Sequence, residues 1–145
     1  MSRFKIKPQV TKSLIREAIE RTKSSIQIND DFFVISFKHL DRTQGSDFHD
    51  WENKFILAHA MDVLEGYCCS SLRSQLSTKF TIYGHYPSNE KTGFKCPDYI
   101  PEDAEWARIH VTGLQCIIGH VVKNVFYVVF LDENHEFYKS ELKHT

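Results

Sequence analysis

The feature that most constrains the fold is a set of three strand-like segments in the last third of the chain. Residues 106–112 alternate apolar with polar or aromatic side chains, which is the period of two expected of a half-buried strand. Residues 116–122 and 125–131 follow, after Gly113 and after Lys123-Asn124, which favour tight turns. The pattern predicts adjacent antiparallel hairpins, with residues 125–131, apolar on both faces, in the centre.

The first part of the chain alternates between helical and strand-like spacing. An apolar stripe with a period of three to four residues follows Asp47 and Asp50, which are candidate helix caps, and Gly66 is expected to bend or divide it. In order, the predicted elements are a helix at 10–22, a strand at 32–38, one or two helices within 47–76 and a strand at 80–83.

Residues 84–105 are rich in turn-forming residues and show no period. A connection of about 20 residues exceeds the usual length, so this loop is either functional or mobile, or it contains a short element. Residues 136–138 are expected to add a last short strand. The order predicts an α+β fold, an antiparallel sheet of about four strands packed by two or three helices.

A chain of 145 residues fits a single domain spanning residues 1–145. Within it, residues 1–30 form a basic arm with a helix, and residues 31–138 form the core. The net charge of −1 argues against a broad electrostatic surface for nucleic acid. The basic arm can contact phosphate or a partner protein, or it can simply be the solvated face of a helix.

The sequence contains no apolar run of the roughly 20 residues that a membrane helix needs, and its first residues do not form a signal peptide. We therefore expect a cytoplasmic protein without membrane association, whose four cysteines stay reduced. No cysteine pair has the Cys-x-x-Cys spacing of a zinc site. The sequence thus predicts no metal and no cofactor.

Arg108 is the first candidate for a functional side chain. If both turns have two central residues, Arg108 lies opposite Gly119 and shares an open sheet face with His110, while Ile109, Ile118 and Val129 form the core under the helices. A cation beside a bare glycine can seat a phosphate or a flat base. Alternatively, the Arg108 stem covers the sheet and its head reaches an acidic loop residue.

His110 and His135 are candidate general acids or bases, because imidazole titrates near neutral pH; each can equally have a structural role. Tyr138, near the end of the chain, is a candidate base for a ribose 2′-hydroxyl. Cleaving RNA without a metal needs such a base, a cation on the phosphate and an acid for the 5′-oxygen. Candidate RNA-binding cations are Lys38, Arg42 and Lys139.

At these residues, in the segments 108–119, 124–132 and 135–138, the chain resembles the RelE/ParE superfamily of toxins from toxin–antitoxin systems. In that family a strand leads into one or two helices, and a hairpin-rich sheet follows that bears an arginine and a late lysine, histidine or tyrosine. Residues 31–138 fit that order, but the near-neutral charge and the 84–105 loop depart from it. The resemblance implies that Arg108 contacts phosphate and that Tyr138 is the late catalytic side chain.

Two functions follow as expectations. The first is an endoribonuclease toxin that cleaves RNA, free or on the ribosome, without a metal ion and is neutralised by an antitoxin protein. The alternative is a non-catalytic module that binds a protein through its aromatic sheet face or its sheet edge, of which a ParE-like toxin is one version.

Overall fold

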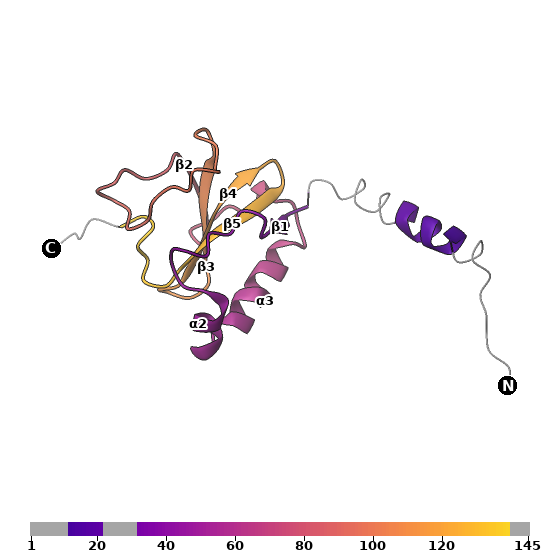
Figure 1. The fold of residues 1–145 in the computed structure, drawn as a ribbon, viewed down its shortest axis with the longest axis horizontal. Coiled ribbons are helices and arrows are strands. Elements are labelled where there is room, and N and C mark those ends of the chain that lie inside the picture. Colours follow the sequence, from indigo (N-terminus) through magenta and orange to yellow (C-terminus); the bar gives the residue numbers. More distant parts are fainter. Residues whose placement is uncertain (1–11, 22–31, 140–145) are drawn as a thin grey trace. The chain divides into compact units, whose positions relative to one another are not determined.

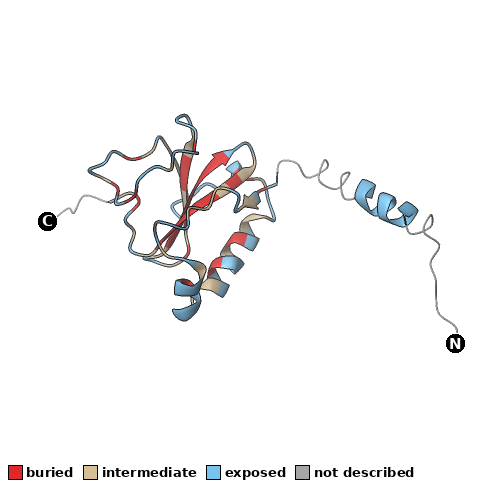
Figure 2. Cartoon of the chain, viewed as in Figure 1, coloured by how far each residue is buried: buried red, intermediate tan, exposed pale blue. Residues whose placement is uncertain are grey.

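The computed structural model describes residues 12–21 and 32–139 (Figure 1). The chain divides into two units, Met1–Asp30 and Asp31–Thr145. In the first unit, residues 12–21 form a helix whose side chains are all exposed (Figure 2). This helix lies within the predicted span of 10–22, and the rest of the basic arm lies outside the described residues.

Five strands of the second unit form one mixed sheet in the order β1-β5-β4-β3-β2 (Figure 1). Because β1 precedes the helices and pairs in parallel with β5, the helices act as the crossover that a parallel pair requires. The predicted α+β class is confirmed, and the all-antiparallel sheet is wrong. The strands are β1 (Val34–Ser36), β2 (Phe80–Gly84), β3 (Glu105–His110), β4 (Cys116–Val122) and β5 (Val125–Asp132).

The predicted apolar stripe is divided into α2 (Phe48–Asn53), α3 (Leu57–Tyr67) and a 3₁₀ turn at Arg73–Gln75. Asp47 caps α2 in a capping box with Asp50, as predicted. The break between α2 and α3 was not predicted; it falls at Phe55, a non-glycine residue with φ of 61°. Among the described residues, no helix is long and apolar enough to cross a membrane.

The two faces of the sheet carry separate cores, which contain most of the buried residues in Figure 2. The helix face packs against Trp51, Leu64 and other residues of the helical region, and it includes Ile109 and Ile117. The other face, here called the loop face, includes Trp106, Cys116, Ile118, Val129 and Phe130 and packs against Phe94, Ile100 and Phe137. The face expected to be open is therefore covered.

The pairing of β3 with β4 differs by one residue from the predicted register. Arg108 lies opposite Ile118, and Ala107 lies opposite Gly119. The connection closes with the Val111 amide bonded to the Gln115 carbonyl, which leaves three residues in the turn instead of two. A slip of one residue moves side chains to the other face, so Ile118 lies on the loop face and not beneath the helices.

β4 and β5 start in the predicted register, with Val122 opposite Val125, but the register shifts between Ile118 and Gly119. As a result Val129 and Phe130, although consecutive, both belong to the loop-face core. The placement of Val129 under the helices was therefore wrong.

Between Gly84 and Glu105 the structure has no helix or strand, so the long loop is the cover of the loop face and contains no short regular element. Residues 136–138, expected as a strand, are instead an irregular segment that inserts Phe137 into the same core.

Candidate functional site

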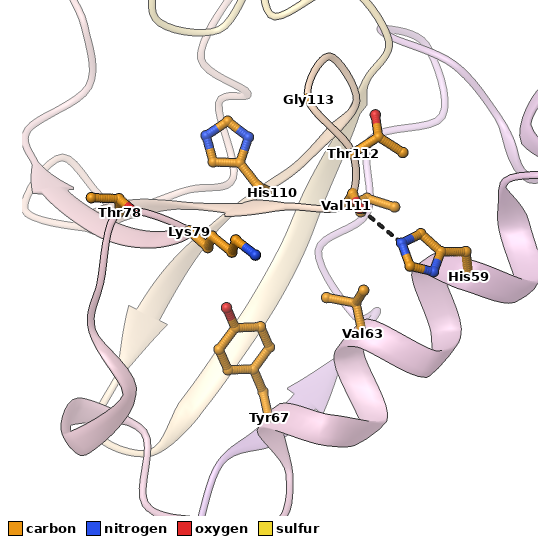
Figure 3. Close-up of a pocket in the computed structure, with 9 residues that line it drawn as sticks. All are labelled: His59, Val63, Tyr67, Thr78, Lys79, His110, Val111, Thr112 and Gly113. Carbon is orange, nitrogen blue, oxygen red and sulfur yellow. Dashed lines mark hydrogen bonds between the residues drawn. The ribbon is translucent and has the colours of Figure 1, made fainter.

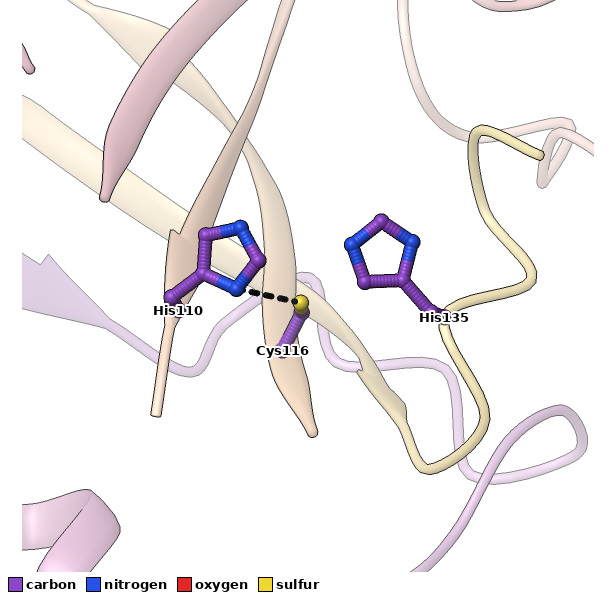
Figure 4. A group of neighbouring side chains, drawn as sticks. All are labelled: His110, Cys116 and His135. Atoms are coloured by element: carbon purple, nitrogen blue, oxygen red, sulfur yellow. Dashed lines mark hydrogen bonds between the residues drawn. The ribbon is translucent and has the colours of Figure 1, made fainter. Parts of the chain in front are cut away.

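Three side chains with chemistry meet at one end of the loop face (Figure 4). His110 is the last residue of β3, Cys116 is the first of β4, and the two are register partners. His135 lies in the turn that follows β5. The Cys116 Sγ is 3.4 Å from His110 Nδ1, and the rings of His110 and His135 have centroids 5.4 Å apart.

The turn that carries His135 is held by a buried carboxylate. Asp132, at the end of β5, is 2% exposed. Its Oδ1 accepts the Glu136 amide and its Oδ2 accepts the Phe137 amide, both at 2.8 Å. These bonds stabilise the turn in which His135 adopts a φ of 60°, a conformation that non-glycine residues seldom adopt. The position of the second imidazole is therefore set by the backbone around it.

The electrostatics of the cluster favour uncharged groups. Burial lowers the pKa of His110, and the Arg108 guanidinium lowers it further. Burial also raises the pKa of the Cys116 thiol to about 12, and the Asp132 carboxylate adds to that shift. At neutral pH the imidazole of His110 is thus a free base and Cys116 is a thiol.

Arg108 lies two residues before His110 on β3, so both side chains project on the same face. Its Nη2 donates to the Thr78 carbonyl at 3.3 Å and to Thr81 Oγ1 at 3.2 Å. Its Nε is buried and has no hydrogen-bond partner. A guanidinium with a free buried N–H is suited to an anion.

Next to Arg108, a row of aromatic and cationic side chains continues along the loop face. The guanidinium carbon of Arg108 lies 5.4 Å from the centroid of Tyr83, and the Tyr83 ring stacks on Tyr138 at 4.8 Å. Lys91 Nζ lies 5.7 Å from the Tyr138 ring centroid. Burial raises the pKa of Tyr83 to about 12, so this phenol stays protonated. The row joins Tyr138 to Arg108 through Tyr83.

A groove of about 590 Å³ opens beside His110 (Figure 3). Its walls come from α3, from the residues before β2 and from the turn after β3. His59 Nε2 donates to the Val111 carbonyl at 2.9 Å and so fixes α3 against that turn. The groove also presents the Tyr67 hydroxyl and the Lys79 ammonium, which are suited to a polar, anionic ligand.

A second pair of histidines lies elsewhere on the loop face. His120 is 1% exposed, and its Nε2 is 2.9 Å from His39 Nδ1. Its Nδ1 has no partner, and its ring stacks on Tyr127. Burial, and then the neighbouring His39, lower the pKa of His120 to about 4. This pair is neutral at pH 7 and belongs to the core.

The structure brings together four predicted residues, Arg108, His110, His135 and Tyr138, through the contacts described above. Lys139 lies next to this row, with its amide bonded to the Lys91 carbonyl. Lys38 and Arg42 do not join them, because they follow β1, which β5 and β4 separate from β3.

Sequence reasoning missed Cys116, Tyr83 and Lys79 as neighbours of the cluster. The spacing His110-x₅-Cys116 across a turn was a possible signal, since residues flanking a hairpin turn become register partners. No protein-family model, curated protein or solved structure matches the chain. The geometry therefore defines a proton-transfer pair beside a cation, on an α+β protein with a five-stranded mixed sheet.

Proposed function

We propose that the chain is a toxin-like endoribonuclease that cleaves RNA without a metal ion and is neutralised by an antitoxin. The observation that carries this proposal is the facing pair of imidazoles, His110 and His135, 5.4 Å apart between ring centroids, on the same sheet face as Arg108. Two imidazoles and one guanidinium are sufficient for attack of a ribose 2′-hydroxyl on the adjacent phosphate.

In the proposed reaction, neutral His110 takes the proton of the 2′-hydroxyl. The 2′-oxygen attacks phosphorus, the bond from phosphorus to the 5′-oxygen breaks, and protonated His135 gives its proton to that oxygen. The products are a 2′,3′-cyclic phosphate and a 5′-hydroxyl. Arg108 stabilises the charge on the phosphate, Tyr138 remains a candidate alternative base, and the groove containing Lys79 is the proposed path of the neighbouring nucleotides.

The test is incubation of the purified full chain with RNA in the presence of a chelator, with identification of the new ends. Cleavage to cyclic phosphates should fall about 10²–10⁴-fold in His110→Ala and in His135→Ala, and also fall in Arg108→Ala and Tyr138→Phe. His49→Ala is the matched control, because that imidazole is exposed on α2. Intact RNA with wild-type protein contradicts the ribonuclease, and harmless expression in every host tested contradicts the toxin.

A non-catalytic protein-binding module, including a ParE-like toxin, is the second candidate. It is favoured by the corner between α2 and α3, where Phe55 is 92% exposed and lines a shallow apolar hollow with Leu57, Ala58 and Met61. Toxicity that persists with intact RNA, and that is lost in Phe55→Ser, supports this module over the enzyme.

A further inference from the structure

We propose that His110, Cys116 and His135 form a binding site for a thiophilic divalent cation, Zn²⁺. One ligand atom from each of the three residues lies within 4.8 Å of the others. The three residues come from β3, from β4 and from the turn after β5, so the sheet itself brings the donors together. In Figure 4 the sulfur lies between the two imidazole rings.

The kind of donor selects the kind of metal. Two imidazole nitrogens and a sulfur suit Zn²⁺ and related transition metals, whereas Mg²⁺ and Ca²⁺ require oxygen ligands. With Zn–S near 2.3 Å and Zn–N near 2.0–2.1 Å, tetrahedral ligands have their S and N atoms about 3.5 Å apart. The observed separation of Cys116 Sγ and His110 Nδ1 is 3.4 Å, so this pair already has the spacing of two ligands.

The surroundings hold the ligands in place before any ion arrives. His110 has a hydrogen bond with the Thr112 backbone, and a second bond of this kind commonly orients metal-binding imidazoles. Asp132 holds the turn of His135 through its two amide contacts. These supports lower the entropy lost on binding.

The charge around the site permits a bound cation. On binding, Cys116 gives up its thiol proton to solvent and forms the S–Zn bond, because metal ligation requires the thiolate. Asp132 is the register partner of Cys116 in β5, so a carboxylate adjoins the site and offsets part of the charge of the ion. Arg108 opposes the ion but favours the thiolate.

The fourth position of the ion is left to water, because three protein ligands with an open position are the usual arrangement of a reactive zinc site. This inference does not rest on the proposed ribonuclease. If both hold, the ion occupies both imidazoles, and Zn²⁺ inhibits RNA cleavage until a chelator removes it.

The test is titration of the full, reduced chain with Co²⁺ alone, a spectroscopic substitute for Zn²⁺. We expect one ion per chain, a sulfur-to-cobalt charge-transfer band, visible bands of tetrahedral cobalt, and loss of all of them when Zn²⁺ is added. His135→Ala is the main variant, because its side chain lies in a turn and is half-buried; circular dichroism checks that it folds. The charge-transfer band should weaken at least tenfold at a fixed Co²⁺ concentration.

The controls are Cys69→Ser and Cys96→Ser, since both thiols are exposed and should leave the spectrum unchanged. Cys116→Ala should abolish the sulfur band, and if that variant does not fold, His110→Ala and His135→Ala still decide. Absence of the band in the wild-type chain overturns the site. So does a band that survives in folded His135→Ala or disappears in Cys69→Ser.

Discussion

The two faces of the sheet differ in chemistry more than in burial. The core of the helix face is apolar, whereas among the described residues the buried polar or charged side chains, Thr92, His120 and Asp132, all belong to the loop face or its cover. Buried atoms without a hydrogen-bond partner include Arg108 Nε, Tyr83 Oη and His120 Nδ1 on the loop face, against Trp51 Nε1 on the helix face.

This contrast indicates a division of labour. An unpaired buried polar atom destabilises a fold by about 1–3 kcal/mol, so a protein that keeps several on one face accepts a less stable core there. Native proteins tolerate such atoms chiefly at functional sites. The helix face therefore supplies stability, and the loop face is where a ligand or a reaction is expected.

The largest expected effect comes from the strand that both faces share. A methyl group on Gly119 would meet the Tyr127 carbonyl oxygen at 2.1 Å and the Phe126 ring at 2.7 Å, so Gly119→Ala must separate β4 from β5. We expect a loss of more than about 4 kcal/mol in the free energy of unfolding, measured by urea denaturation. Gly113→Ala is the control, because no heavy atom lies within 4 Å of its added methyl group; equal effects would contradict the structure.

Adjacent isoleucines compare the two faces directly. Ile117 is on the helix face and Ile118 on the loop face, and both are fully buried. Truncation of each to alanine should lower the free energy of unfolding by about 3 kcal/mol, because the long loop packs as core and not as a mobile lid. A loss below about 1 kcal/mol for Ile118→Ala alone would show that the loop-face cover opens in solution.

Asp132→Asn should affect the loop face alone. The amide side chain keeps one acceptor oxygen, so one of the two backbone N–H groups loses its charged partner, at about 1.5–2 kcal/mol. Hydrogen exchange should accelerate at the amides of Glu136 and Phe137 and stay unchanged at Ala60 in α3. Asp47→Asn is the matched control, since asparagine caps helices about as well as aspartate. Uniform acceleration would argue against this separation of the faces.

The histidine pair makes the loop face sensitive to acid. His120 has a pKa of about 4 in the folded chain and near 6.5 when unfolded, so the unfolded chain binds more protons between these values. Its contribution is complete above pH 6.5 and is lost as the pH falls through about 4, on the order of 1–2 kcal/mol.

Urea denaturation across this pH range measures the slope, and His120→Gln should flatten it. The charged groups nearest to His120 are His39 and, around the adjoining hollow, Asp103, Glu105 and Lys123. Their own titration is common to both proteins and cancels in the comparison. An unchanged slope in the glutamine variant would contradict a buried neutral His120.

Local sequence patterns were enough to predict most elements of the fold. The hairpin at Lys123-Asn124, the cap at Asp47 and the central position of β5 all follow from neighbouring residues. The parallel pairing of β1 with β5 did not follow, because it joins Val34 to Val125 and no local signal specifies so distant a partner. The register of β3 with β4 failed for a smaller reason, one extra residue in the turn after Val111.

The site shows the same boundary between local and distant information. Arg108 and His110 were predictable as neighbours, since residues two apart on a strand share a face. The proximity of His135 required the positive φ of its turn and the Asp132 contacts, which composition does not encode. The covering of the loop face by residues 85–104 depends on Phe94 and Ile100, apolar residues scattered in a loop without a period.

The parallel strand pair also has a consequence for how the chain is made. β1 is synthesised early, but its partner β5 ends at Asp132, so the sheet cannot close until nearly the whole chain has left the ribosome. Such non-local pairing slows folding. The unpaired edge of β5 is meanwhile open to other strands, which invites aggregation. A chaperone or a co-translated binding partner that covers this edge would raise the yield of native protein.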